Sequence, residues 1–101
     1  DQGHILENVV YLELIRRGYE VYVGKMGEAE VDFIAIGDEG EEYYQVAYTV
    51  IDGDGKTLER ELKPLDSIRD HNPKYLLTMD HGPVVSHNGI KQINVLDWLL
   101  R

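Results

Sequence analysis

The chain has 101 residues, which is enough for one small domain and too few for two. Hydrophobic residues make up 43% and charged residues 29%, a composition typical of a globular domain and too apolar for a disordered segment. The formal net charge of -9 opposes nonspecific attraction to DNA, RNA and anionic membranes. Cysteine is absent, which excludes disulfides and thiolate zinc sites and is compatible with the reducing cytoplasm. We therefore expect one cytoplasmic domain, residues 1–101, with no membrane partner.

The first half of the chain predicts a helix followed by an antiparallel meander of three strands. Residues 5–17 lack glycine and proline, and their apolar side chains go almost all the way around a helical wheel before Gly18 stops the helix. Such a helix is either covered on several sides or presents one face to a partner. Residues 19–25, 30–36 and 43–50 are rich in β-branched and aromatic side chains and are separated by short turns.

The second half predicts a helix, a strand and a short closing helix. Leucines at positions 58, 62 and 65, followed by Ile68, predict an amphipathic helix that Pro64 should kink and that should end at residues 71–73. Residues 75–79 resemble a strand and residues 81–89 a polar loop, and residues 90–100 a strand fragment and a short helix capped by Asn94. The fold class is therefore α/β of the α+β type.

Asp32 is the residue that most needs an explanation, because it lies within an otherwise apolar strand. Strict alternation would put it on one strand face with Glu30, Ile34 and Ile36. A buried carboxylate is costly unless it is paired, hydrogen-bonded or bound to a metal ion. Lys25, just across a turn, would supply an ion pair with Glu30 or Asp32.

A metal site is the other explanation for Asp32. Glu7 on the first helix and the side-chain carbonyl of Gln45 on the third strand would complete an oxygen site together with Asp32. Magnesium prefers such oxygen ligands, so it is the one candidate cofactor. Both explanations stay open at this point.

Short motifs spread over nearly the whole chain add a resemblance to the residue-level argument. They include GHILENVVYLEL at the start of the first helix, EVDF in the second strand and YQV in the third. The matching segments are residues 3–14, 16–22, 30–33, 44–46, 59–61, 64–65, 72–75, 89–91 and 94–97. Together with the order of elements, they resemble the PD-(D/E)XK nuclease-like domain, of unknown function, at the C-terminus of many prokaryotic AAA-type ATPases. The resemblance implies a restriction endonuclease-like core and an N-terminal ATPase domain as partner, so we expect the chain to be a fragment of a longer protein.

The same resemblance assigns roles to individual positions. Glu7 matches the acid of the first helix, Asp32 the strand-two aspartate, Gln45 the second acid and Ala47 the lysine. In such nucleases the two acids hold a divalent ion that activates water, and the lysine orients or stabilises the attacking oxygen. Two of the four positions have therefore lost their charge, and Lys25 is a candidate for a lysine that has migrated to a neighbouring strand.

We therefore expect a degenerate, noncatalytic nuclease-fold module that binds protein or nucleic acid for an AAA-type ATPase. Lys56, Arg60 and Lys63 recur on one helix side and form a weak candidate surface for nucleic acid. One alternative is an active magnesium-dependent nuclease acting on DNA or RNA, in which Lys25 or a cation from a partner replaces the missing lysine. A second alternative is a structural docking or dimerisation domain, whose apolar first helix packs against the ATPase or a second copy of the chain.

Overall fold

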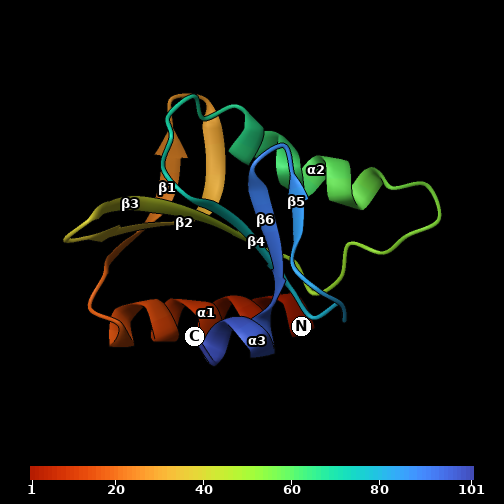
Figure 1. The fold of residues 1–101 in the computed structure, drawn as a ribbon, viewed down its shortest axis with the longest axis horizontal. Coiled ribbons are helices and arrows are strands. Elements are labelled where there is room, and N and C mark those ends of the chain that lie inside the picture. Colours follow the sequence, from red (N-terminus) through yellow and green to blue (C-terminus); the bar gives the residue numbers. More distant parts are fainter.

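The computed structural model describes residues 1–101, except for the side chain of Met26. The elements follow the predicted order, with one additional strand (Figure 1). The helices are α1 (Gln2–Arg16), α2 (Lys56–Asp66) and α3 (Val95–Leu99). The strands are β1 (Glu20–Met26), β2 (Ala29–Gly37), β3 (Gly40–Val46), β4 (Lys74–Thr78), β5 (Val85–His87) and β6 (Ile90–Asn94).

The strands form one mixed sheet of six strands in the order β1-β2-β3-β4-β6-β5. The meander β1, β2 and β3 is antiparallel, β4 is parallel to both β3 and β6, and β5 is antiparallel to β6. The parallel step from β3 to β4 requires a crossover, and α2 supplies it. The predicted α+β class is confirmed.

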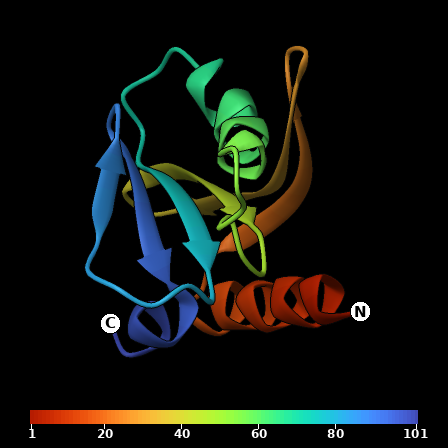
Figure 2. The same cartoon turned by 90° about the vertical axis from the view of Figure 1, so that its right-hand side faces the viewer.

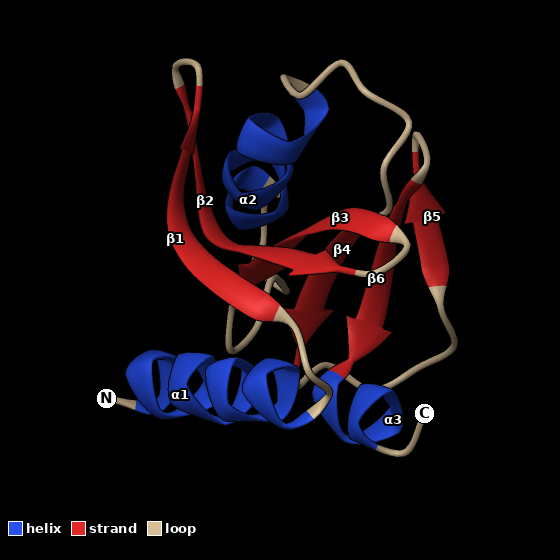
Figure 3. Ribbon diagram, turned by 90° about the vertical axis from the view of Figure 1, so that its left-hand side faces the viewer, coloured by secondary structure: helices blue, strands red, loops and turns tan.

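Helices cover both faces of the sheet. Figures 2 and 3 show α1 and α3 on one side of the sheet and α2 on the other. Each side has its own core: Leu6, Val10 and Leu14 of α1 pack on the first side, and Leu65 of α2 packs on the second. None of the helices in the described chain is long and apolar enough to cross a lipid bilayer.

The first helix begins three residues earlier than the apolar pattern predicts. The carboxylate of Asp1 accepts the N–H of His4 at 2.9 Å, which satisfies one of the free donors at the helix start. The helix ends before Gly18, whose φ of 92° is in the left-handed region that glycine tolerates. Its exposed outer face is apolar and includes Ile5 and Leu12.

Three predicted boundaries differ from the structure. The third strand ends at Val46 instead of residue 50: the segment that follows keeps two backbone hydrogen bonds to the end of β4, and the carboxylate of Asp80 then accepts the N–H of Val50. The second helix runs through Pro64 and ends at Asp66 rather than at residues 71–73. The loop predicted at residues 81–89 contains β5, which forms a hairpin with β6.

Candidate functional site

Glu7, Asp32 and Gln45 lie around one cavity, at the end of the sheet where α1 and α2 approach from opposite faces. The cavity measures about 770 Å³ and is also lined by Lys25 and by Glu61 of α2. The four residues predicted as the site, Lys25 included, are therefore brought together from four different elements.

A break in the alternation of β2 places Asp32 in this cavity. Tyr22 of β1 pairs with Ile34, but Gly24 pairs with Val31, so β2 uses one residue more than β1 over this stretch. Val31 and Ile34, three positions apart, consequently both pack on the α2 side. The extra residue is the pattern of a β-bulge. The predicted common face of Glu30, Asp32, Ile34 and Ile36 is therefore wrong: Asp32 lies beside Glu7 of α1, whereas Ile34 and Ile36 pack on the side of α2.

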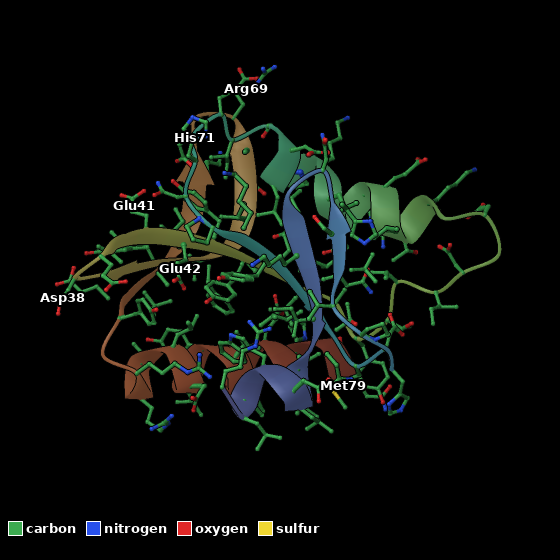
Figure 4. The ribbon with its side chains drawn as sticks, viewed as in Figure 1. Asp38, Glu41, Glu42, Arg69, His71 and Met79 are labelled. Carbon is green, nitrogen blue, oxygen red and sulfur yellow. The ribbon has the colours of Figure 1, made fainter. Side chains whose placement is uncertain are left out.

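The opposite end of β3 shows the regular arrangement for comparison. In Figure 4 the side chains of Glu41 and Glu42 project to opposite faces of the sheet. Glu42 accepts the hydroxyl of Tyr44 at 2.6 Å, and Glu41 accepts that of Tyr43 at 2.9 Å. Side chains thus alternate between the two faces of the sheet near the β2–β3 turn. The break in this alternation lies at the other end of β2, near Asp32.

Side chains replace the strand-to-strand hydrogen bonds beyond the last pair of β2 and β3, Phe33 and Tyr44. The backbone N–H of Asp32 donates to Oε1 of Gln45 at 2.8 Å. The backbone N–H of Val46 donates to the Asp32 carboxylate, also at 2.8 Å. These two bonds satisfy backbone donors that the bulge leaves without a partner.

Gln45 also ties α2 to the sheet. Its Nε2 lies 3.3 Å from the backbone carbonyl of Glu61 and 3.4 Å from the Glu61 carboxylate. Gln45 is buried, with 6% of its surface exposed, and Ala47 packs on the same face of the sheet. Gln45 is therefore a structural bridge between β2, β3 and α2.

The carboxylates of the cavity disfavour one another's charge. The pKa of Asp32 is raised to about 6, first by burial and further by the neighbouring Glu7, while the N–H of Val46 lowers it. The pKa of Glu61 is also raised, by burial and by the charge of Asp32. The guanidinium of Arg60 beside Glu61 acts in the opposite direction and lowers the pKa of Glu61.

Lys25 lies at the rim of the cavity and faces solvent. Its Nζ is 3.7 Å from Oε1 of Glu30, with 71% of the lysine side chain exposed. Of the two ion-pair partners considered from the sequence, the structure selects Glu30 rather than Asp32.

Of the three basic residues of α2, Arg60 lies beside a carboxylate of the cavity, with its Nε 3.9 Å from Oε2 of Glu61. Arg60 and Lys63 line a neighbouring hollow between α2 and the β1–β2 hairpin, which shares Gln45 and Glu61 with the main cavity. Lys56 is at the start of the helix, 3.8 Å from Asp54.

The donor set was also compared with what a magnesium ion requires. Among the described residues, no group of three or more histidine, aspartate or glutamate side chains is arranged to hold a metal ion. Oε1 of Gln45 already accepts the N–H of Asp32. The residues as they stand therefore fit a resident magnesium ion poorly, and the magnesium site of Glu7, Asp32 and Gln45 remains a prediction.

Glu61 is the site residue that sequence reasoning missed. A sequence signal for it exists: it falls among the apolar positions of α2, three residues after Leu58 and four before Leu65. An acid within an apolar helix stripe indicates a buried polar partner, which here is Gln45.

Two relatives were found among curated proteins. The chain is 40% identical over 96 residues to an uncharacterized protein of Haemophilus influenzae, a match that covers 95% of this chain and 23% of that protein. It is 39% identical over 75 residues to the uncharacterized protein MJ1544 of Methanocaldococcus jannaschii, covering 69% of this chain and 16% of the relative. No family model matches the sequence, and no solved structure matches it. The chain thus has homologues in a bacterium and an archaeon and spans less than a quarter of the length of each.

Proposed function

We propose that the chain is a noncatalytic module with a restriction endonuclease-like core, which serves a larger AAA-type ATPase by binding another macromolecule. The order α1, β1 to β3, α2 and β4 supports this core, because it is the order of elements on which the resemblance to the PD-(D/E)XK domain rests. The convergence of Glu7, Asp32 and Gln45 on one cavity supports the assignment of the site positions. The greater length of the relatives supports a larger parent protein.

The hydrogen bonds of Gln45 are the observation that carries the noncatalytic part of the proposal. At this position an active enzyme of the proposed class has an acid, whereas Gln45 uses its carbonyl on Asp32 and its amide on Glu61. Ala47, on the same face, has no group that could orient or stabilise an attacking oxygen. Asp32 and Gln45 thus hold the bulged strands and α2 together.

The charge distribution favours a protein partner over nucleic acid. A net charge of -9 repels a polyanion at long range. Of the three basic residues on α2, Lys56 lies 3.8 Å from Asp54 and Arg60 lies 3.9 Å from Glu61. This surface is therefore partly neutralised by its own neighbours.

Metal titration combined with a cleavage assay tests the proposal. The chain is titrated calorimetrically with magnesium and manganese and then incubated with plasmid DNA, single-stranded DNA and RNA, beside the variants Asp32→Asn and Glu7→Gln. We expect no saturable metal binding at millimolar concentrations and no cleavage above that of the variants. Metal-dependent cleavage that Asp32→Asn abolishes, with an unchanged circular dichroism spectrum, would show that the module is an enzyme.

An active nuclease is the second candidate, and the position of Lys25 at the cavity rim is the observation that favours it. In that case Lys25→Met should abolish metal-dependent cleavage. Lys91→Met is the matched control, because Lys91 is an exposed lysine on β6 that does not line the cavity. Equal activity of the two variants would exclude Lys25 as the replacement lysine.

A further inference from the structure

The outer face of α1 is apolar although the chain is strongly acidic. Leu6, Val10 and Leu14 already bury the inner face against the sheet. On the opposite side, Ile5 and Leu12 are each 64% exposed. Ile15 at 45% and Val9 at 37% extend this outer face. Exposed apolar groups that gather on one helix face mark an interaction surface, whereas scattered ones do not.

Part of the outer face is mirrored along the helix, whereas Val9 and Ile15 stand opposite the polar residues Asn8 and Gln2. Measured from the midpoint between positions 8 and 9, Ile5 mirrors Leu12 and Asp1 mirrors Arg16. The apolar pair is therefore flanked by an acid at one end and a base at the other. Two such helices laid antiparallel would place each isoleucine against a leucine and each acid near an arginine.

We propose that α1 is an isologous dimer contact, in which the outer face packs antiparallel against α1 of a second copy of the chain. A two-fold axis requires a self-complementary patch, and two mirrored pairs of α1, Ile5 with Leu12 and Asp1 with Arg16, meet that requirement. Antiparallel packing also brings opposite ends of the two helix dipoles together. This proposal does not depend on the nuclease-like function.

The acids nearest to this face are not obstacles to the contact. Glu13 is bound by both Arg16 and Arg17 at 2.7 Å, so its charge is compensated within its own helix. Glu7 points instead toward the cavity beside Asp32. The remaining repulsion between two copies of charge -9 acts at long range and is screened by salt. The dimer should therefore tighten as the ionic strength rises, unlike a contact held by ion pairs.

The size of the patch indicates a weak dimer. With its 15 residues, α1 is about 22 Å long. On the same side of the sheet lies α3 (Figure 1), where Leu96 of this helix and Leu100 just after it are also exposed. A contact of this extent falls below the standard interface of about 1,600 Å². We expect dissociation in the micromolar range.

Sedimentation of the chain across concentration and salt tests the proposal first. Wild type should shift from monomer to dimer, and Leu12→Glu should remain a monomer. Ile51→Glu is the matched control, since Ile51 is 75% exposed in the loop between β3 and α2, and it should still dimerise. A wild type that stays monomeric at hundreds of micromolar in high salt would overturn the proposal.

Cysteine cross-linking tests the antiparallel register, because the chain contains no cysteine of its own. Asn8 is exposed and lies beside the proposed two-fold axis, so Asn8→Cys should form a disulfide dimer rapidly. Gln2→Cys is equally exposed but would be about 20 Å from its mate in the dimer, and it should cross-link only slowly. Equal rates for the two variants would contradict the antiparallel contact even if a dimer is present.

Discussion

Glu13 and Asp32 are both acids placed among hydrophobic residues, yet the protein treats their charges in opposite ways. The carboxylate of Glu13 receives hydrogen bonds from Arg16 and Arg17, each at 2.7 Å, which lower its pKa to about 2. Asp32 is largely buried and lies beside the carboxylate of Glu7, and both effects raise its pKa, to about 6. One acid is held in its charged form and the other is pushed toward its neutral form.

The two environments also differ in what they contribute to the fold. Arg17 extends from Glu13 to α3, where it donates to the carbonyl of Trp98 at 2.8 Å and stacks 4.4 Å from the centre of its ring. The Glu13 cluster therefore joins α1 to α3 with compensated charges. The Asp32 cluster joins β2, β3 and α2 while leaving its negative charge uncompensated. An acid with a strongly shifted pKa in a cavity is typical of a functional site. The shifted pKa of Asp32 is therefore consistent with the proposed origin of the cavity as a nuclease site.

The largest expected effect comes from Gln45→Leu, which breaks the bridge without changing any charge. The substitution leaves the backbone N–H of Asp32 without its acceptor and removes the link to Glu61. We expect a loss of roughly 2–3 kcal/mol in the free energy of unfolding, the cost of an unsatisfied buried donor together with a lost hydrogen bond. Urea denaturation measures this loss. A loss in the free energy of unfolding below about 0.5 kcal/mol would mean that the hydrogen bonds of Gln45 do not hold the fold together and that its side chain is free to serve as a ligand.

Asp32→Asn should stabilise the fold, because it removes a partly buried negative charge. The asparagine carbonyl can still accept the N–H of Val46, while the repulsion with Glu7 disappears. At pH 8 we expect a gain on the order of 1–2 kcal/mol, less than the full pKa shift implies because Asp32 is partly solvated.

The pH dependence of this gain has a definite sign. The pKa of Asp32 rises on folding from 3.8 to about 6, so the native state binds the proton more tightly and wild-type stability falls as the pH rises through this window. The advantage of Asp32→Asn should therefore be complete above pH 6 and absent near pH 3.8. Unfolding curves of wild type and variant near pH 3.8 and above pH 6 check this prediction. A difference in stability that is the same at every pH would contradict the raised pKa of Asp32.

Glu13→Gln should show the opposite pH dependence with a smaller amplitude. Because the pKa of Glu13 is lowered from 4.5 to about 2, its charged form stabilises the fold above pH 4.5, and that contribution is lost as the pH falls toward 2. The variant should thus be less stable than wild type at pH 7 and approach it near pH 2. Thermal unfolding at the two pH values measures this, and Glu59→Gln, an exposed acid of α2, is the control.

Most of the fold could be predicted because its signals are local. The apolar patterns located the helices and the meander, and Asn94 caps α3 as expected, accepting from Leu96 and Asp97. The missed strand β5 also had a local signal: Asn88 and Gly89 adopt φ of 55° and 91°, as in the tight Asn-Gly turn of a hairpin. With only three residues, one of them apolar, β5 is too short to show the alternation that predicts a strand.

The site was less predictable because its geometry depends on the bulge. Residue chemistry and the resemblance predict Glu7, Asp32 and Gln45 as site residues, but the predicted strand face of Asp32 is wrong. The signal lay on another strand, at Gly24, where an added side chain would come within 2.8 Å of Ile34. Glu61 reaches the site through the packing of α2 on the sheet; its place in the apolar stripe of the helix indicates burial but does not identify its partner.

The smallest expected effect is that of Lys25→Met on the titration of Asp32. Lys25 is largely exposed and pairs with Glu30, and it is not among the causes of the Asp32 shift. Solvent screening should therefore leave the pKa of Asp32 almost unchanged, as measured by carboxyl NMR. If Lys25 had taken over the charge of the lost lysine, its removal would raise the pKa of Asp32 clearly above 6. An unchanged titration would instead mean that no cation compensates the charge of Asp32, whereas Arg16 and Arg17 both compensate that of Glu13.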